Sequence, residues 1–153
     1  MWAKAKVELD PAFTAAAKRD PAMVMQEMRV GVGKGARVVR AAQRQTAPRL
    51  TGNLAGHIVI RTSRKYLSAS IGPTVSHALI RDRGTEVMRG GRIQAKAHNW
   101  LTFRVGDRWV KVRSVKQTGA HYLKRALDLV TGQLQAIIDD VSRRVAAKLF
   151  GGQ

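Results

Sequence analysis

The stretch TAPRLTGNL, residues 46–54, is the place where the sequence changes its periodicity. Pro48 lacks a backbone N–H and disfavours the helical conformation of Ala47, so a helix arriving from the N-terminal side is predicted to stop here. Thr51-Gly52-Asn53 is typical of a turn, because glycine adopts positive φ without strain. Apolar residues recur every three or four positions before this stretch and tend to alternate with polar ones over 58–71. The sequence therefore predicts a corner between a helix and a sheet.

The segment before the corner predicts a long helix over 20–47. Asp20-Pro21 combines an N-cap residue with a proline at the first helical position, and apolar residues at helical spacing continue to about Thr46. Residues 1–19 are predicted to form an N-terminal arm and a short helix, because Asp10-Pro11 repeats the same combination.

The long helix contains Gly31-Val32-Gly33-Lys34-Gly35, in which each interior glycine costs about 0.5–1 kcal/mol relative to alanine. A phosphate-binding loop requires a preceding strand, wider glycine spacing and a Ser or Thr after the lysine. The sequence has none of these, so we interpret Gly31 and Gly35, four residues apart, as a site where another backbone packs closely.

Two pairs of strands and one short segment are predicted after the corner. Residues 56–64 and 66–72 alternate as two paired strands, with their apolar residues facing the core: Ile58, Ile60, Leu67, Ala69 and Ile71. Residues 76–85 fit a short strand or a helical turn, and we favour the helical turn. Residues 100–105 and 108–113 alternate around Gly106-Asp107, which is the clearest hairpin in the chain.

The last third of the chain predicts a loop and a second long helix. Residues 86–99 carry glycines and arginines with little periodicity, so they predict a long mobile loop. Residues 120–149 predict a C-terminal helix with a continuous apolar stripe, ended by Gly151-Gly152. We therefore expect a single α+β domain over 1–153, in which a small antiparallel β-sheet within 54–113 packs against a long N-terminal helix and a long C-terminal helix.

The composition says more about the partners of the protein than about its fold. The 153 residues include 28 Lys and Arg against 10 Asp and Glu, a formal net charge of +18. The excess is greatest over 54–119, with 13 basic and 3 acidic residues. Such a field favours polyanions or acidic protein surfaces. The sequence has no cysteine, no membrane-length apolar run and no secretory leader, so we expect a protein made in a cytoplasm.

No motif predicts catalysis. His57, His77, His98 and His121 lie in four different segments without metal-ligand spacing, and the adjacent Asp139-Asp140 are expected on different faces of a helix. We therefore expect no enzyme activity, no catalytic residues, no cofactor and no metal site.

The order of five motifs carries a resemblance. The motifs are Thr46-Ala47-Pro48, Thr51-Gly52-Asn53-Leu54, Arg83-Gly84-Thr85-Glu86, Leu101-Thr102-Phe103 and Tyr122-Leu123-Lys124-Arg125-Ala126-Leu127. In this order the sequence, over roughly 20–149, resembles the tail-completion or neck proteins of long-tailed bacteriophages, the broad group that includes the lambda minor tail protein Z.

The resemblance implies a structural virion protein of the phage neck that joins the tail to the head-side connector. It implies a ring, expected to be a homo-hexamer, with other neck and tail proteins as partners: the connector or head-completion protein and the tail terminator or tail tube. The implied location is the virion, after assembly in the bacterial host cytoplasm. Non-specific contact with DNA in the channel is a further expectation, and no membrane contact is expected.

The candidate contact residues cluster around the predicted loop. For contacts with an acidic partner or with channel DNA we select Arg81, Arg83, Arg89, Arg92 and Lys96. The alternative function is a stand-alone nucleic-acid-binding protein, and composition also allows another basic housekeeping protein. Proteins that bind single strands stack bases on exposed aromatic residues. We expect instead that Phe103 and Trp109 are cross-strand neighbours in a core or an interface.

Overall fold

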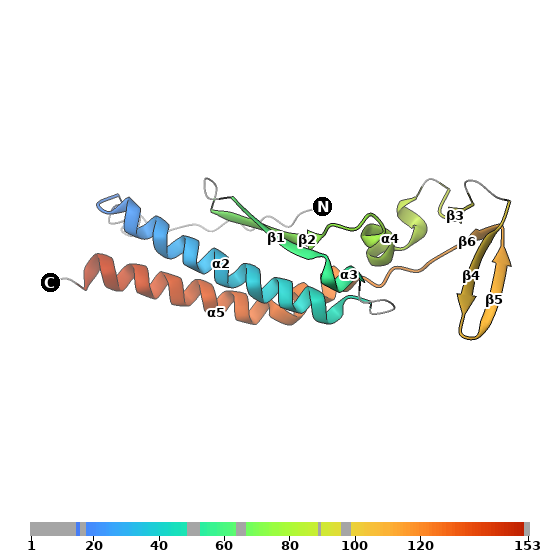
Figure 1. The fold of residues 1–153 in the computed structure, drawn as a ribbon. Coiled ribbons are helices and arrows are strands. Elements are labelled where there is room, and N and C mark those ends of the chain that lie inside the picture. Colours follow the sequence, from blue (N-terminus) through green and yellow to red (C-terminus); the bar gives the residue numbers. More distant parts are fainter. Residues whose placement is uncertain are drawn as a thin grey trace. The chain divides into compact units, whose positions relative to one another are not determined.

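Two long helices and small antiparallel sheets make up the described part of the chain, which comprises residues 15, 18–48, 53–63, 67–88, 90–95 and 99–151 of a computed structural model (Figure 1). The α+β class predicted from the sequence is confirmed. The described elements are α2 (Pro21–Thr46), α3 (Asn53–Gly56), β1 (Ile58–Ser63), β2 (Ser68–Pro73), α4 (Ala78–Arg83), η1 (Thr85–Val87), β3 (Ile93–Gln94), β4 (Leu101–Val105), β5 (Arg108–Val112), β6 (Ser114–Val115) and α5 (Tyr122–Phe150).

The chain divides into two compact units, and the two long helices contribute residues to both. The first unit contains Met1–Val38, Ile60–Ser70 and Val130–Gln153, and the second contains Val39–Val59 and Ile71–Leu129. The described strands pair as β1 with β2, β3 with β6 and β4 with β5. No described helix is long and apolar enough to cross a bilayer.

Helix α2 begins and ends where the sequence predicts. The carboxylate of Asp20 accepts a hydrogen bond from the backbone N–H of Met23 at 3.1 Å, which satisfies one of the free donors of the first turn. Thr46 is the last helical residue, two positions before Pro48. The helix runs without interruption through Gly31, Gly33 and Gly35.

In the first unit, α2 packs closely against α5 at two of these glycines. A Cβ atom added to Gly31 would lie 2.5 Å from the Cγ2 atom of Val141, and one added to Gly35 would lie 3.3 Å from a Cδ atom of Leu134. A Cβ atom at Gly33 would meet nothing within 4 Å. Close packing at Gly31 and Gly35 is therefore confirmed, but side chains of α5 rather than its backbone fill the space beside them.

An ionic network joins the same two helices. The Glu27 carboxylate, in a residue only 9% exposed, lies 2.7 Å from the Nζ atom of Lys148 and 3.1 Å from the Nε atom of Arg144. Arg144 also lies 3.2 Å from Asp140, which is 3.6 Å from Lys34. The hydrogen bond from Lys148 lowers the pKa of the Glu27 carboxyl below its ordinary value, although burial opposes this effect.

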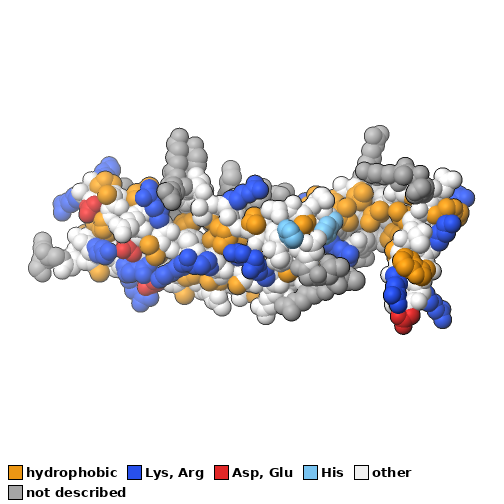
Figure 2. Space-filling model, viewed as in Figure 1, with side chains coloured by type: hydrophobic (Ala, Val, Ile, Leu, Met, Phe, Trp, Pro, Cys, Tyr) orange, Lys and Arg blue, Asp and Glu red, His pale blue; other side chains and the backbone are white. Residues whose placement is uncertain are grey.

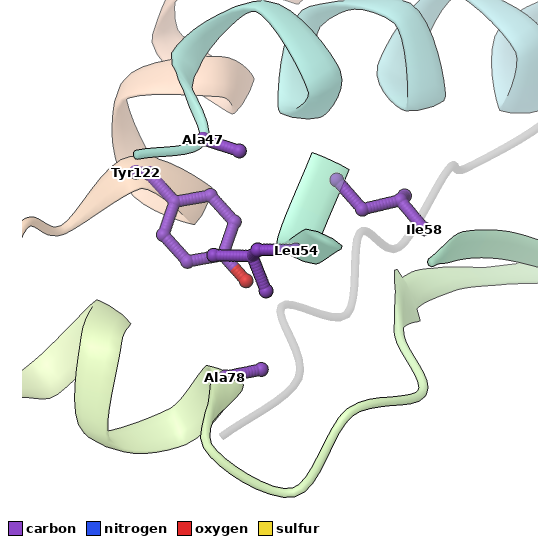
Figure 3. Close-up of a cluster of buried hydrophobic side chains, with 5 residues drawn as sticks. All are labelled: Ala47, Leu54, Ile58, Ala78 and Tyr122. Carbon is purple, nitrogen blue, oxygen red and sulfur yellow. The ribbon is translucent and has the colours of Figure 1, made fainter. Parts of the chain in front are cut away.

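The core of the second unit is organised around Tyr122, the first residue of α5. Its fully buried ring lies among Ala47, Leu54 and Ala78, with the equally buried Ile58 in the same cluster (Figure 3). The hydroxyl of Thr46 donates to the carbonyl oxygen of Tyr122 at 2.9 Å. The end of α2, the corner, the start of β1, the start of α4 and the start of α5 therefore meet in one place.

The segment 82–85 is attached to the segment leading into α5. The backbone N–H of Thr85 donates to the carbonyl oxygen of Gln117 at 2.8 Å, and the buried Thr85 hydroxyl accepts from the N–H of Gln117 at 3.1 Å. The buried Asp82 carboxylate accepts from the N–H of Leu123 at 3.0 Å. Asp82 thereby satisfies a free donor in the first turn of α5 and places a negative charge at that end of the helix dipole.

Two predictions of the elements are wrong in detail. The predicted strand 56–64 begins only at Ile58, because residues 53–56 form the short helix α3. The predicted loop 86–99 contains the end of η1 and the strand β3, which pairs with β6 through Ile93 opposite Val115 and Gln94 opposite Ser114. A two-residue strand has no periodicity of its own, so only its distant partner reveals it.

The other predicted elements are confirmed where they are described. The helical turn is α4, the hairpin is β4 and β5, and the C-terminal helix is α5. The arm and short helix predicted over 1–19 lie outside the described residues, except for residues 15, 18 and 19, and so does the turn at 51–52. Loop mobility and the single domain remain predictions.

The glycines of α2 give a matched pair of variants. Gly33→Ala is expected to raise the free energy of unfolding by about 0.5–1 kcal/mol, because alanine is the better helix former and the added Cβ meets nothing. Gly31→Ala has the same propensity gain, but its Cβ overpacks the stiff side chain of Val141 at a cost of about 1–3 kcal/mol. Urea denaturation should order the proteins as Gly33→Ala, parent and Gly31→Ala. Equal effects of the two changes would contradict the close packing at Gly31.

The ionic network predicts that the free energy of unfolding depends on pH. Because the pKa of Glu27 is lowered, its ionic stabilisation is fully present above the ordinary value of 4.5 and is lost as the pH falls through the lowered pKa. Glu27→Gln should therefore reduce the free energy of unfolding at pH 7, and the difference from the parent should shrink well below pH 4.5. Glu86→Gln, at an exposed position, is the control with the same change of charge. A difference that does not depend on pH would contradict this role.

Tyr122 predicts a transition at alkaline pH. Burial, reinforced by the charge of Asp82, raises its pKa to about 12. The stability that depends on a neutral Tyr122 phenol is therefore fully present below its ordinary pKa of 10.0 and is lost as the pH rises towards 12. The Tyr66→Phe variant contains Tyr122 as its only tyrosine, so its tyrosinate absorbance should rise near pH 12, together with the loss of helical circular dichroism. A midpoint near 10 in a protein that is still folded would contradict the burial of the hydroxyl.

Candidate interaction surface

The structure describes three of the five residues selected from the sequence. Arg81 and Arg83 lie on α4, where Arg83 is exposed and Arg81 is half-buried. Arg92 is exposed just before β3, and its Nε atom donates to the Ser114 hydroxyl of β6 at 2.9 Å. Arg89 and Lys96 lie outside the described residues. The structure therefore places two of the selected residues on one short helix and holds a third against β6.

The register of the β4–β5 hairpin separates two faces with different chemistry. Leu101 lies opposite Val112 and Phe103 opposite Val110, and these four apolar side chains are half-buried. Thr102 lies opposite Lys111 and Arg104 opposite Trp109, and these four are exposed. The hairpin turns at Gly106-Asp107, where Gly106 has a φ of +59°, and its tip is closed by an ion pair of 2.9 Å between Arg104 and Asp107.

This register overturns the expected pairing of Phe103 with Trp109. The two-residue turn places Val105 opposite Arg108, and Trp109 is therefore opposite Arg104, while Phe103 is opposite Val110. Phe103 and Trp109 therefore lie on opposite faces of the hairpin. Trp109 is 73% exposed, which also excludes a place in the core of this chain.

The exposed face carries two tryptophans among basic residues. We call it the tryptophan face and define it as Trp100, Thr102, Arg104, Trp109, Lys111 and Arg113. Trp100 is 41% exposed, and both the Lys111 ammonium, at 5.6 Å, and the Arg113 guanidinium, at 5.2 Å, lie over its ring. These are cation–π distances, so Trp100 holds the two cations in place. Figure 2 shows an apolar patch on this hairpin bordered by basic side chains.

Two open hollows adjoin the tryptophan face. The first is lined by Asn99, Trp100, Thr102 and Lys111, and the second by Gln94, Ala95, Asn99, Arg113 and Ser114. Asn99 belongs to both. Polar groups and cations line them, and neither is an enclosed cavity. The chemistry of this surface is therefore suited to an anionic ligand.

The described residues contain no group of three or more His, Cys, Asp or Glu side chains placed to hold a metal ion. The tryptophan face, by contrast, was not among the residues selected from the sequence. The sequence does contain the pattern that produces this face. Trp100, Thr102 and Arg104 are alternate residues on one side of the first strand, and Trp109, Lys111 and Arg113 are alternate residues on the other side of the turn. A two-residue turn brings these two sets to the same face of the hairpin.

In comparisons with known proteins, no family model, no curated protein and no solved structure matches this chain.

Proposed function

We propose that the chain is a structural subunit of the neck of a long-tailed bacteriophage, a tail-completion protein that joins the tail to the head-side connector. One observation carries the proposal. Motifs that carry the resemblance from distant parts of the sequence meet around Tyr122. Thr46 bonds to the Tyr122 carbonyl group, Ala47 and Leu54 pack with its ring, and the strand-like bridge from Gly84 to Thr118 leads into α5.

This convergence supports the resemblance because it gives the order of the motifs a physical cause. Motifs separated by up to 76 residues in the sequence bind one another directly, as Thr46 and Tyr122 do. Four of the five motifs therefore belong to one arrangement in which the contacts support one another, whereas Leu101-Thr102-Phe103 lies in β4, outside it.

Surface apolar residues of α5 support assembly into a ring. Leu129 is 61% exposed and Ile138 is 48% exposed, although this helix already buries Ala126, Val130 and Val145. Helix α5 therefore has more apolar positions than one buried face uses. Leu129 and Ile138 are nine residues apart, so they lie on opposite sides of α5. We propose that they contact the two neighbouring copies in a six-membered ring, in which heterologous contacts close by rotation.

The proposed partners are the adjoining proteins of the neck and tail: the connector or head-completion protein and the tail terminator or tail tube. The proposed location is the virion, and the proposed role is assembly without catalysis. The basic residues Arg81, Arg83, Arg89, Arg92 and Lys96 remain our prediction for contact with acidic surfaces of these partners or with DNA in the channel, because the charge of +18 favours either.

A second candidate is a stand-alone nucleic-acid-binding protein, and the tryptophan face favours it. Proteins that bind single-stranded nucleic acid commonly place exposed aromatic side chains beside cationic residues. The two candidates differ in where the protein is found. A neck subunit co-purifies with assembled particles in a fixed ring, whereas a stand-alone binding protein remains with nucleic acid in the cell extract.

The ring proposal predicts a separation of folding from assembly. Leu129→Ser combined with Ile138→Ser should lower the thermal unfolding temperature of the isolated chain only modestly, since Leu129 is mostly exposed and Ile138 about half exposed. The same variant should fail to restore joined particles when it replaces the parent chain during phage assembly, so that unjoined heads and tails accumulate. Gln133→Ser with Ala136→Ser, at exposed positions of the same helix, is the matched control.

Electron microscopy of particles made with the parent chain should show this protein at the head–tail junction in six-fold symmetry. Particles that join normally with the double Ser variant would remove Leu129 and Ile138 from the interface. Joined particles that lack the protein, or that hold one copy without rotational symmetry, would reject the neck function itself.

A further inference from the structure

The tryptophan face has a feature that the proposed ring contacts do not use. Trp109 exposes 73% of its surface beside Arg104, and Trp100 lies under the two cations Lys111 and Arg113. Exposed tryptophan is uncommon outside binding sites, because indole has a large apolar surface that favours burial. An isolated two-stranded hairpin is also only marginally stable, and contact on one face would stabilise it.

Charge determines the class of partner. Between residues 99 and 115 the sequence has four basic residues and one acidic residue, Asp107. Asp107 is held by Arg104 in the ion pair at the tip, so Arg108, Lys111 and Arg113 face no acidic residue of the hairpin sequence. A partner that covers this surface must therefore supply negative charge.

We propose that the tryptophan face binds single-stranded nucleic acid without sequence preference. A base stacks on the indole of Trp109, and the phosphates that follow this base along the nucleic-acid strand contact the Lys111 ammonium and the Arg113 guanidinium. Trp100 is a positioning residue that holds these two cations through its ring. Trp109 and Lys111 follow one another on one face of β5, about 6.7 Å apart, and Arg113 lies just beyond the end of this strand. This order suits successive nucleotides of an extended strand.

The two tryptophans have different parts in this proposal. The ring of Trp100 already carries its own cations at 5.6 and 5.2 Å. Trp109 is much more exposed and offers a flat surface to a partner. A planar base fits that surface and is sequence-tolerant, because every base has a π-face. An acidic peptide supplies carboxylates but no base to stack, and a duplex keeps its base faces covered, so single-stranded nucleic acid uses more of the observed chemistry than either.

The inference deepens the second candidate function, because it names the residues and the class of ligand, and it does not depend on the proposed function in the phage neck. It assigns a ligand class to residues outside α5 and outside the five basic residues selected from the sequence. A chain that proves not to be a neck subunit would still carry this surface, and a ring in the neck would carry it in several copies.

The test measures binding of a labelled oligothymidylate by fluorescence anisotropy at several salt concentrations. The parent chain should bind the oligonucleotide more tightly than a duplex of equal length and more tightly than polyglutamate of equal charge. Trp109→Ala should weaken binding about tenfold or more, because one stacked base is lost, while the salt dependence stays unchanged. Trp109→Phe should recover part of the affinity.

The cations should affect salt dependence instead. Lys111→Gln with Arg113→Gln should reduce the slope of log affinity against log salt by about 1.4, the value for two phosphates of a single strand. Lys124→Gln with Arg125→Gln removes the same charge from exposed positions of α5 and should leave the slope nearly unchanged. Circular dichroism checks that every variant is folded.

Three results would overturn the proposal. An affinity unchanged by Trp109→Ala would exclude base stacking. Equal effects of the Lys111/Arg113 pair and the Lys124/Arg125 pair would reduce the binding to overall charge. Tighter binding of polyglutamate than of the oligonucleotide would assign the tryptophan face to an acidic protein partner.

Discussion

The close approach of two backbones at Gly84 and Gly119 is the constraint on which the second unit depends. A Cβ atom at Gly84 would lie 2.5 Å from the carbonyl oxygen of Gln117, and one at Gly119 would lie 2.5 Å from that of Asp82. Gly84 also has a φ of +81°, which other residues adopt only with strain. Without this contact, neither Thr85 nor Asp82 reaches the segment before α5, and Tyr122 is not placed among Ala47, Leu54 and Ala78.

The first unit brings two helices together in a similar way. Gly31 and Gly35 bring α2 close to α5, and Glu27 then binds cations from the last turns of α5. Breaking one partner of a largely buried ionic group is costly, because the other charge stays desolvated. The small residues therefore set the distance between the helices, and Glu27 favours one register between them. Both units thus rely on glycine for proximity and on an acidic side chain for specificity.

The sequence was sufficient for the two long helices and the hairpins, because their evidence is local. Asp20-Pro21 and Pro48 determine where α2 begins and ends, and Gly106-Asp107 determines the turn between β4 and β5. It was insufficient where evidence comes from distant residues, as in the pairing of β3 with β6. The candidate surface was missed for another reason: a run of alternating residues predicts a strand but does not say which face is covered. Only the register and the exposure of Trp109 identify the uncovered face.

The acidic residues explain why a basic sequence also presents a basic surface. Eight of the ten are described, and six of these bind groups of the chain itself. Asp20 and Asp82 accept backbone N–H groups, Glu27, Asp107 and Asp140 bind cations, and Asp139 accepts from Gln135. The negative charge is thereby used to build the fold, whereas most of the far more numerous cations have no acidic residue to pair with. The surplus positive charge must be balanced from outside the chain, by counterions when it is alone and by an anionic partner when it is bound.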